Sequence, residues 1–121
     1  TQEGQVWEAA MAANYHKSSN LKVIVDRNRI QNDDFVGVQM EIGDIAEKFA
    51  AFGWLVKEID GHDIEAIVEV LDWASKDHGA PVAIVAHTTK GKGVSFMEDN
   101  PDFHGKAPDD AELEIALEEL T

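Results

Sequence analysis

The chain has 121 residues, a length that fits one domain over residues 1–121. Its formal net charge of −14 argues against nucleic acid and anionic membranes as partners, because both attract cationic surfaces. The absence of cysteine excludes disulfides and thiol chemistry, and no apolar run reaches the roughly 18 residues of a membrane span. We expect a cytoplasmic protein.

The chain opens with a predicted helix over residues 3–16. Alanine dominates this segment, and the i, i+3, i+4, i+7 spacing places several small side chains on one face. Small side chains on a helix let another backbone approach closely. The face consists of Val6, Ala9, Ala10 and Ala13.

A strand, a loop and a second helix are predicted next. Residues 21–26 (LKVIVD) predict a short buried strand, because they are rich in β-branched side chains. Residues 27–42 have no clear period and are predicted as a long loop. Residues 44–52 predict a helix with its apolar side chains inward, and Gly53 suits its C-terminal cap.

The second half continues the alternation. Residues 54–60 predict a strand, and residues 63–79 predict a helix that Gly and Pro would end. A third strand follows over 82–88, then a loop over 89–108 and a last helix over 109–120, whose acids are expected to form a solvated face. The apolar stripe of helix 63–79 consists of Ile64, Ile67, Val68 and Leu71.

This order predicts an α/β fold, with a parallel β-sheet of about three strands and flanking helices. In open sheets of this kind, ligands bind beyond the carboxyl ends of the strands. The first and third strands lead into residues 26–34 and 88–104. We therefore expect a functional site in these two loops.

Asn28 follows the first strand in the segment VDRNRIQ. Its side-chain oxygen and the backbone carbonyl two residues later can face one cation, and Mg²⁺ prefers such hard oxygen ligands. An asparagine here fits equally well in a turn in which it bonds its own backbone.

Residues 90–93, KGKG, are a second candidate. Glycine lets a backbone approach a phosphate closely, but the spacing is not that of a P-loop. The alternative is a flexible basic loop without a ligand.

His104 stands beside Gly105 in the same long loop. An imidazole there can contact a phosphate or transfer a proton, and the alternative is a solvated side chain. The spacing of the remaining histidines fits no compact zinc motif, so we predict structural or surface roles for them. They are His16, His62, His78 and His87.

Four separated segments agree in order and spacing with one family: QEGQVWEAA, VIVDRNRIQ, FGWLVKEIDGHD and AHTTKGKGVSFMEDNPDFHGKAP. Together they resemble the N-terminal half of transketolase, of the type that is split into two subunits. The resemblance implies the C-terminal half of the subunit that binds the diphosphate of thiamine diphosphate, and so half of that fold. It also implies a reaction of carbohydrate metabolism that moves a two-carbon ketol unit between sugar phosphates.

The resemblance assigns roles to residues of both loops. Asn28 matches a side-chain ligand of Mg²⁺, and Ile30 matches a backbone-carbonyl ligand. Lys90 and Gly91 match the loop that passes over the cofactor. His104 matches the catalytic histidine that contacts the cofactor diphosphate and the sugar substrate.

Glu3 and Glu8 match acids near a dimer interface, and Glu3 is also a candidate for the cofactor site. Apart from the resemblance, Glu3 suits the positive start of a helix, and a buried Glu8 would be unusual.

The resemblance further implies a Gly-Asp-Gly motif, whose Asp binds Mg²⁺, immediately before Gln2 or one residue earlier. Neither this motif nor a pyrimidine-binding domain occurs in the 121 residues. We therefore expect the active protein to need an additional N-terminal segment and a pyrimidine-binding partner subunit, in a dimer or larger assembly. We expect the chain alone to bind the cofactor weakly and to be inactive.

Two other functions compete with this one. The first is a non-catalytic scaffold module that keeps the fold and pairs through an apolar edge. The second is a fragment of the related deoxyxylulose-phosphate synthase. Asn28, the KGKG loop and His104 favour the enzyme over the scaffold, and the segment GVSFMEDNP favours split transketolase over the synthase.

Overall fold

The computed structural model describes residues 1–32 and 34–121; Asp33, in the loop predicted at 27–42, lies outside the described residues. The helices are α1 (Gly4–Tyr15), α2 (Val36–Gln39), α3 (Ile45–Ala51), α4 (Ile64–Ala74), α5 (Asp110–Glu119) and a 3-10 helix, η1 (Pro101–Phe103). The strands are β1 (Lys22–Arg27), β2 (Ile30–Gln31), β3 (Asp34–Phe35), β4 (Leu55–Asp60) and β5 (Val82–His87). None of the described helices is long and apolar enough to cross a membrane.

The chain divides into two compact units. The sheet unit comprises residues 1–27 and 42–87, and the loop unit comprises residues 28–41 and 88–121. Each unit combines two separate stretches of the sequence, so neither could be recognised as a continuous segment.

The sheet unit contains a three-stranded parallel sheet in the order β1-β5-β4, which confirms the predicted α/β fold. The central strand is β5, and its first four residues, 82–85, are at most 2% exposed. A parallel strand that is covered on both faces has a continuous apolar sequence, and VAIV is such a sequence. The connection from β1 to β4 passes through α3, and the connection from β4 to β5 passes through α4, as the sequence predicts.

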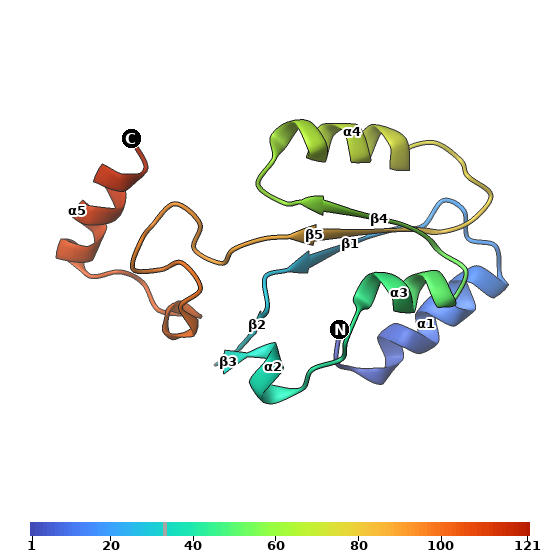
Figure 1. Ribbon diagram of the computed structural model, residues 1–121, viewed down its shortest axis with the longest axis horizontal. Helices are drawn as coiled ribbons and strands as arrows, with labels where there is room; N and C mark the ends of the chain where they lie inside the picture. The colour runs from blue at the N-terminus through green and yellow to red at the C-terminus, as the bar shows by residue number, and fades with distance from the viewer. Residues whose placement is uncertain (33) are drawn as a thin grey trace. The chain divides into compact units, whose positions relative to one another are not determined.

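Helices cover both faces of this sheet, with α1 and α3 on one face and α4 on the other (Figure 1). Two apolar clusters result. The buried members of the first are Ala10, Ala13, Val25, Ile45, Ala46, Phe49, Trp54, Ala83 and Val85. The buried members of the second are Val70, Ala74, Val82 and Ile84.

Aspartate caps start α3 and α4. Asp44 accepts a hydrogen bond from the Glu47 amide at 2.8 Å, and Asp63 accepts one from the Glu65 amide at 3.0 Å. Each cap satisfies a backbone donor that the first helical turn leaves unpaired. Gly53, at φ +84°, ends α3 as predicted.

Helix α4 ends at Ala74, earlier than the predicted 79. Side chains take over the hydrogen bonds beyond that point: Ser75 donates to the Asp72 carbonyl at 2.8 Å, and the Gly79 amide donates to Asp77 at 2.9 Å. Val70 and Ala74 form the buried face of the helix. Much of the apolar stripe read from the sequence is exposed: Ile64 by 70%, Val68 by 53% and Leu71 by 44%.

The prediction of a featureless loop over 27–42 is wrong. This segment contains the antiparallel pair of β2 and β3, followed by the single turn α2. Arg29 and Asn32 have positive φ angles of 65° and 51°, so residues other than glycine make the reversals. The Val36 amide donates to the Arg29 carbonyl at 2.8 Å and closes the segment on itself.

Candidate functional site

Asn28 is the first residue beyond the carboxyl end of β1. Its Oδ1 accepts a hydrogen bond from the Ile30 amide at 3.0 Å. This is the turn in which an asparagine bonds its own backbone, and the bond fixes the orientation of the side-chain amide. Because an amide oxygen can accept two partners, the turn is compatible with a cation at the same atom.

The carbonyl of Ile30 is the second oxygen implied by the sequence. Ile30 is held in register with Phe35 by the β2–β3 pair. An amide oxygen and a peptide oxygen are hard, neutral donors of the kind that Mg²⁺ accepts. Among the described residues, no group of three or more His, Cys, Asp or Glu side chains could hold a metal ion.

The KGKG segment forms a closed turn. Gly91 has φ +75°, and a Cβ there would lie 2.5 Å from the Met97 carbonyl oxygen, so this position requires glycine. The Lys92 amide donates to the Thr89 carbonyl at 3.2 Å, and the Gly93 amide donates to Glu98 at 3.0 Å. Two of the amides considered for phosphate binding are thus donated within the loop itself.

The lysines of this loop differ in their surroundings. Lys90 is half-buried, and its carbonyl accepts from the Asp99 amide at 3.0 Å. The ammonium of Lys92 lies 3.4 Å from the Glu98 carboxylate. The positive charge of Lys92 is therefore partly offset by Glu98, and Lys90 is the better candidate for a phosphate contact.

His104 is exposed at the end of η1. Its backbone amide donates to the Pro101 carbonyl at 2.8 Å, and its imidazole has no hydrogen-bond partner among residues 1–32 and 34–121. The neighbouring Phe103 packs against Phe96, with ring centroids 5.4 Å apart, and Lys106 lies over the Phe103 ring. The backbone around the histidine is thus fixed while its side chain stays accessible.

Sequence reasoning missed a contact between α5 and the same loop. Glu119 accepts hydrogen bonds from both the amide and the hydroxyl of Ser95, each at 2.6 Å. These bonds lower the pKa of Glu119 below its usual value. Glu119 is exposed, in agreement with the expected solvated face of the last helix, but it also has a specific partner. No local pattern signals this bond, because the two residues are 24 positions apart.

Glu3 and Glu8 belong to the sheet unit, whereas Asn28, Ile30, Lys90, Gly91 and His104 all belong to the loop unit. Glu3 is the N-cap residue of α1 and accepts a hydrogen bond from the Gln5 side chain. Glu8 is exposed on α1. The carboxylate of Glu8 therefore carries no burial penalty within this chain.

Two of the other histidines have clear structural partners. The Nε2 atom of His78 lies 2.9 Å from the Trp73 carbonyl oxygen, beyond the end of α4. The Nε2 atom of His87 lies 2.7 Å from the Glu58 carboxylate, across β5 and β4.

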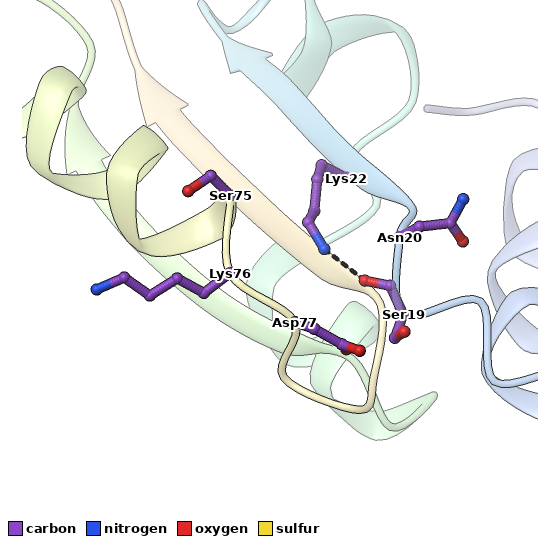
Figure 2. Close-up of a pocket in the computed structure, with 6 residues that line it drawn as sticks. All are labelled: Ser19, Asn20, Lys22, Ser75, Lys76 and Asp77. Atoms are coloured by element: carbon purple, nitrogen blue, oxygen red, sulfur yellow. Dashed lines mark hydrogen bonds between the residues drawn. The ribbon is translucent and has the colours of Figure 1, made fainter.

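A polar hollow of about 230 Å³ lies at the opposite end of β1 from Asn28. Two of its charged groups already have partners: Lys22 donates to the Ser19 carbonyl, and Asp77 has its pKa lowered by the Gly79 amide, by Ser19 and by Lys22. Figure 2 shows Lys76 pointing away from Lys22. We therefore do not assign an anion site to this hollow, whose lining residues are Ser19, Asn20, Lys22, Ser75, Lys76 and Asp77.

Comparison with known proteins supports one family throughout. The family described as "Transketolase, thiamine diphosphate binding domain" matches residues 1–120. A subunit of the apulose-4-phosphate transketolase of Actinobacillus succinogenes is 41% identical over 118 residues, which is 98% of this chain and 42% of that protein. A 6-deoxy-6-sulfo-D-fructose transketolase subunit from a Clostridium species is 36% identical, over 98% of this chain and 43% of that protein.

The solved structures agree. The transketolase of Campylobacter jejuni superposes with a TM-score of 0.74 and 28% identity, over 98% of this chain and 22% of that chain. The present chain thus spans less than half the length of these relatives. With a family match over nearly its whole length and relatives that align across the strands and both loops, the chain belongs to the thiamine diphosphate-binding domain of the transketolase family.

Proposed function

We propose that this chain holds the diphosphate end of thiamine diphosphate, with Mg²⁺, in a transketolase that moves a two-carbon ketol unit between sugar phosphates. The observation that carries the proposal is the turn at Asn28. It fixes an amide oxygen at the carboxyl end of a parallel strand, where open sheets bind their ligands.

Asn28 and Ile30 would contribute two oxygen ligands to the cation, and the diphosphate would contribute others. The cofactor, when bound, supplies the stabilisation of the two-carbon carbanion. The protein residues position the cofactor and balance its charge. The remainder of the coordination shell would come from polypeptide outside this chain.

The loop residues would contact the anionic groups of cofactor and substrate. Lys90 and Gly91 would lie beside the diphosphate, and the exposed imidazole of His104 would contact the diphosphate and the sugar. In an acidic protein of net charge −14, cationic side chains in this loop would offset the repulsion between the chain and phosphorylated ligands. His104 is also the residue best suited to move a proton near neutral pH.

The transferase activity would belong to an assembly. Relatives named as transketolase subunits support a pyrimidine-binding partner subunit, and the length they have in excess of this chain supports a further segment. Glu3 and Glu8 would lie near an interface between two such sites, with Glu3 beside the cofactor. We place this assembly in the cytoplasm.

Asn28→Ala tests the metal assignment. In ³¹P NMR titrations of thiamine diphosphate at saturating Mg²⁺, we expect the wild-type chain to shift the diphosphate signals only at high protein concentration, because two ligands bind weakly. Asn28→Ala should abolish the shift, whereas Asn20→Ala, a matched exposed asparagine in the sheet unit, should retain it. Equal shifts in wild type and Asn28→Ala would remove Asn28 from the site.

His104→Ala tests the substrate contact in the assembled enzyme. We expect turnover to fall by at least about tenfold, a typical lower range for the loss of one acid–base or charged contact. Phe103 and Phe96 hold the backbone of this loop, so far-ultraviolet circular dichroism should not change. His16→Ala serves as the matched control, because His16 is exposed in the sheet unit and contacts Tyr15. Unchanged turnover in His104→Ala would contradict its role.

A further inference from the structure

Glu119 is an acid at the end of a helix where the helix itself favours a base. It is the last residue of α5, and the last turn of α5 contains no basic residue. The carboxyl end of a helix carries a partial negative charge, so a carboxylate there destabilises the helix when it has no other partner. Glu119 is also exposed, so burial does not account for its position.

A contact with the loop after β5 does account for it. One carboxylate oxygen of Glu119, Oε2, accepts from the Ser95 amide, and the other, Oε1, accepts from the Ser95 hydroxyl, each at 2.6 Å. The next residue, Leu120, lies over Gly93, where an added Cβ would come within 3.0 Å of the Leu120 Cδ2 atom. Hydrogen bonds to an ionised carboxylate are stronger than neutral ones. The end of α5 is thus attached to residues 93–95 of the same loop unit.

Val94 connects this contact to the KGKG turn, residues 90–93. Its side chain is 6% exposed, and its amide donates to the Gly91 carbonyl at 3.1 Å. The Asp99 amide donates to the Lys90 carbonyl at 3.0 Å and closes the loop on the other side. Because Ser95 directly follows Val94, a contact that fixes Ser95 also restrains the backbone of the turn.

We propose that Glu119 is a positioning residue, which through Ser95 holds the KGKG turn in the conformation that contacts the cofactor diphosphate. This role rests on the proposed function and extends it to α5, although Glu119 itself would not touch the cofactor. When the contact is open, the turn samples other conformations. The apparent affinity then falls in proportion to the fraction of chains that keep the binding conformation.

Positioning and direct charge effects predict opposite results for Glu119→Ala. Removal of a negative charge near an anionic ligand reduces repulsion, so charge alone would strengthen binding. The helix does not account for a loss of affinity either. Alanine has a higher helix propensity than glutamate, and the substitution removes an acid from the negative end of α5. Weaker cofactor binding in Glu119→Ala would therefore identify positioning.

The first test is a ³¹P NMR titration of thiamine diphosphate with the full chain at saturating Mg²⁺. The initial slope of the shift against protein concentration is proportional to the affinity, so saturation is not required. Glu119→Ala should reduce this slope by about fivefold. Glu118→Ala is the matched control, because Glu118 is the adjacent exposed acid of α5, and its slope should be equal to that of wild type or steeper.

Glu119→Gln is the conservative variant. The glutamine oxygen can accept from the Ser95 amide while its NH₂ group donates to the Ser95 hydroxyl oxygen. This variant keeps both bonds without the charge, so it should retain most of the wild-type slope. A slope in Glu119→Gln as low as that in Glu119→Ala would contradict positioning by geometry.

The second test is amide hydrogen exchange of residues 91–98 without cofactor. Exchange should accelerate in Glu119→Ala and stay at the wild-type rate in Glu118→Ala, with unchanged circular dichroism in both. Wild-type exchange in Glu119→Ala, or a slope at least as steep as that of wild type, would overturn the role of Glu119. If Asn28→Ala abolishes the ³¹P shift and Glu119→Ala retains it, this role alone is wrong. If the wild-type chain produces no shift, the proposed function is wrong as well.

Discussion

The sheet unit and the loop unit are stabilised in different ways. Both apolar clusters lie in the sheet unit, where β5 and Phe49 are almost inaccessible to solvent. In the described part of the loop unit, the buried apolar side chains are limited to Val36, Val94 and Ala116. Hydrogen bonds between side chains and nearby backbone take the place of burial there, for example at Asn28 and Ser95.

This difference shows how a small chain separates stability from function. Burial of apolar area supplies most of the free energy of folding, and it is concentrated in the unit that contains none of the proposed Mg²⁺ ligands. Apart from Glu3 at the start of α1, the proposed ligand contacts lie in loops that depend on local geometry. Such loops open more readily than a packed core, as ligand-binding segments generally do.

The largest expected effect is on the core of the sheet unit. Phe49→Ala should reduce the free energy of unfolding by about 3–5 kcal/mol, because it removes a buried ring and leaves a cavity. Phe35→Ala removes a ring that is 39% exposed in the loop unit and should cost less than about 1 kcal/mol. Urea denaturation measures both losses, followed by tryptophan fluorescence for the sheet unit, which contains Trp7, Trp54 and Trp73, and by hydrogen exchange for the loop unit, which contains no tryptophan. Similar losses would contradict the contrast between the units.

A smaller, local effect is expected at Gly91. Gly91→Ala combines a positive φ with a 2.5 Å approach to the Met97 carbonyl, so we expect a cost of about 1–3 kcal/mol within the loop unit. Gly79→Ala is the control: Gly79 has a similar φ of 71°, but a Cβ there would lie in open space. The difference between the two variants therefore measures the steric clash with Met97, apart from the backbone strain of a positive φ. Hydrogen exchange of residues 90–98 should accelerate in Gly91→Ala alone. Faster exchange in β5 would show that the two units are not separable.

The cap of α5 should contribute less. Asp109 and Glu112 form a capping box, in which each side chain accepts a hydrogen bond from the backbone amide of the other at 2.9 Å. Asp109→Ala should destabilise α5 by about 0.5–2 kcal/mol. Glu114→Ala, on the same helix, should change little. Amide exchange in α5 is the measurement, and equal protection in both variants would rule out a role for the cap.

The smallest effect is a pH dependence at Glu119. The hydrogen bonds from Ser95 lower the pKa of Glu119 in the folded state, so the contact is at full strength above the usual value of 4.5 and is lost as the pH falls through the lowered pKa. In the wild-type chain, the NMR chemical shift of the Ser95 amide should change with pH as Glu119 titrates. In Glu119→Gln, the same chemical shift should not depend on pH in this range. A titrating amide in the variant would point to a different acid.

The sequence was sufficient for most of the sheet unit. The apolar runs of the strands, the alternation of strands with helices and Gly53 are local signals, and each has a direct physical cause. The hairpin of β2 and β3 was missed because residues 27–42 show no clear period, and because its positive φ angles occur at Arg29 and Asn32 and not at glycine. The exposed side of α4 was not foreseen either, because periodicity identifies a stripe but not which element covers it.

The site was predictable in part. Motif order identified the candidate residues, and the turn at Asn28 was one of the two conformations considered. No local pattern indicates that the Lys92 and Gly93 amides are donated within the loop, because those bonds depend on how the chain folds back at Thr89 and Glu98. The Ser95–Glu119 contact has the same origin in tertiary structure.

Trp54 gives the sheet unit a built-in optical reporter. Its indole is 5% exposed, donates to the Ala10 carbonyl at 2.9 Å and packs against Phe49, with ring centroids 5.1 Å apart. The other two tryptophans of the chain, Trp7 and Trp73, belong to the same unit. The tryptophan emission should therefore move to longer wavelength when the sheet unit unfolds and should not respond to opening of the loop unit, so the two units could be followed separately without a label.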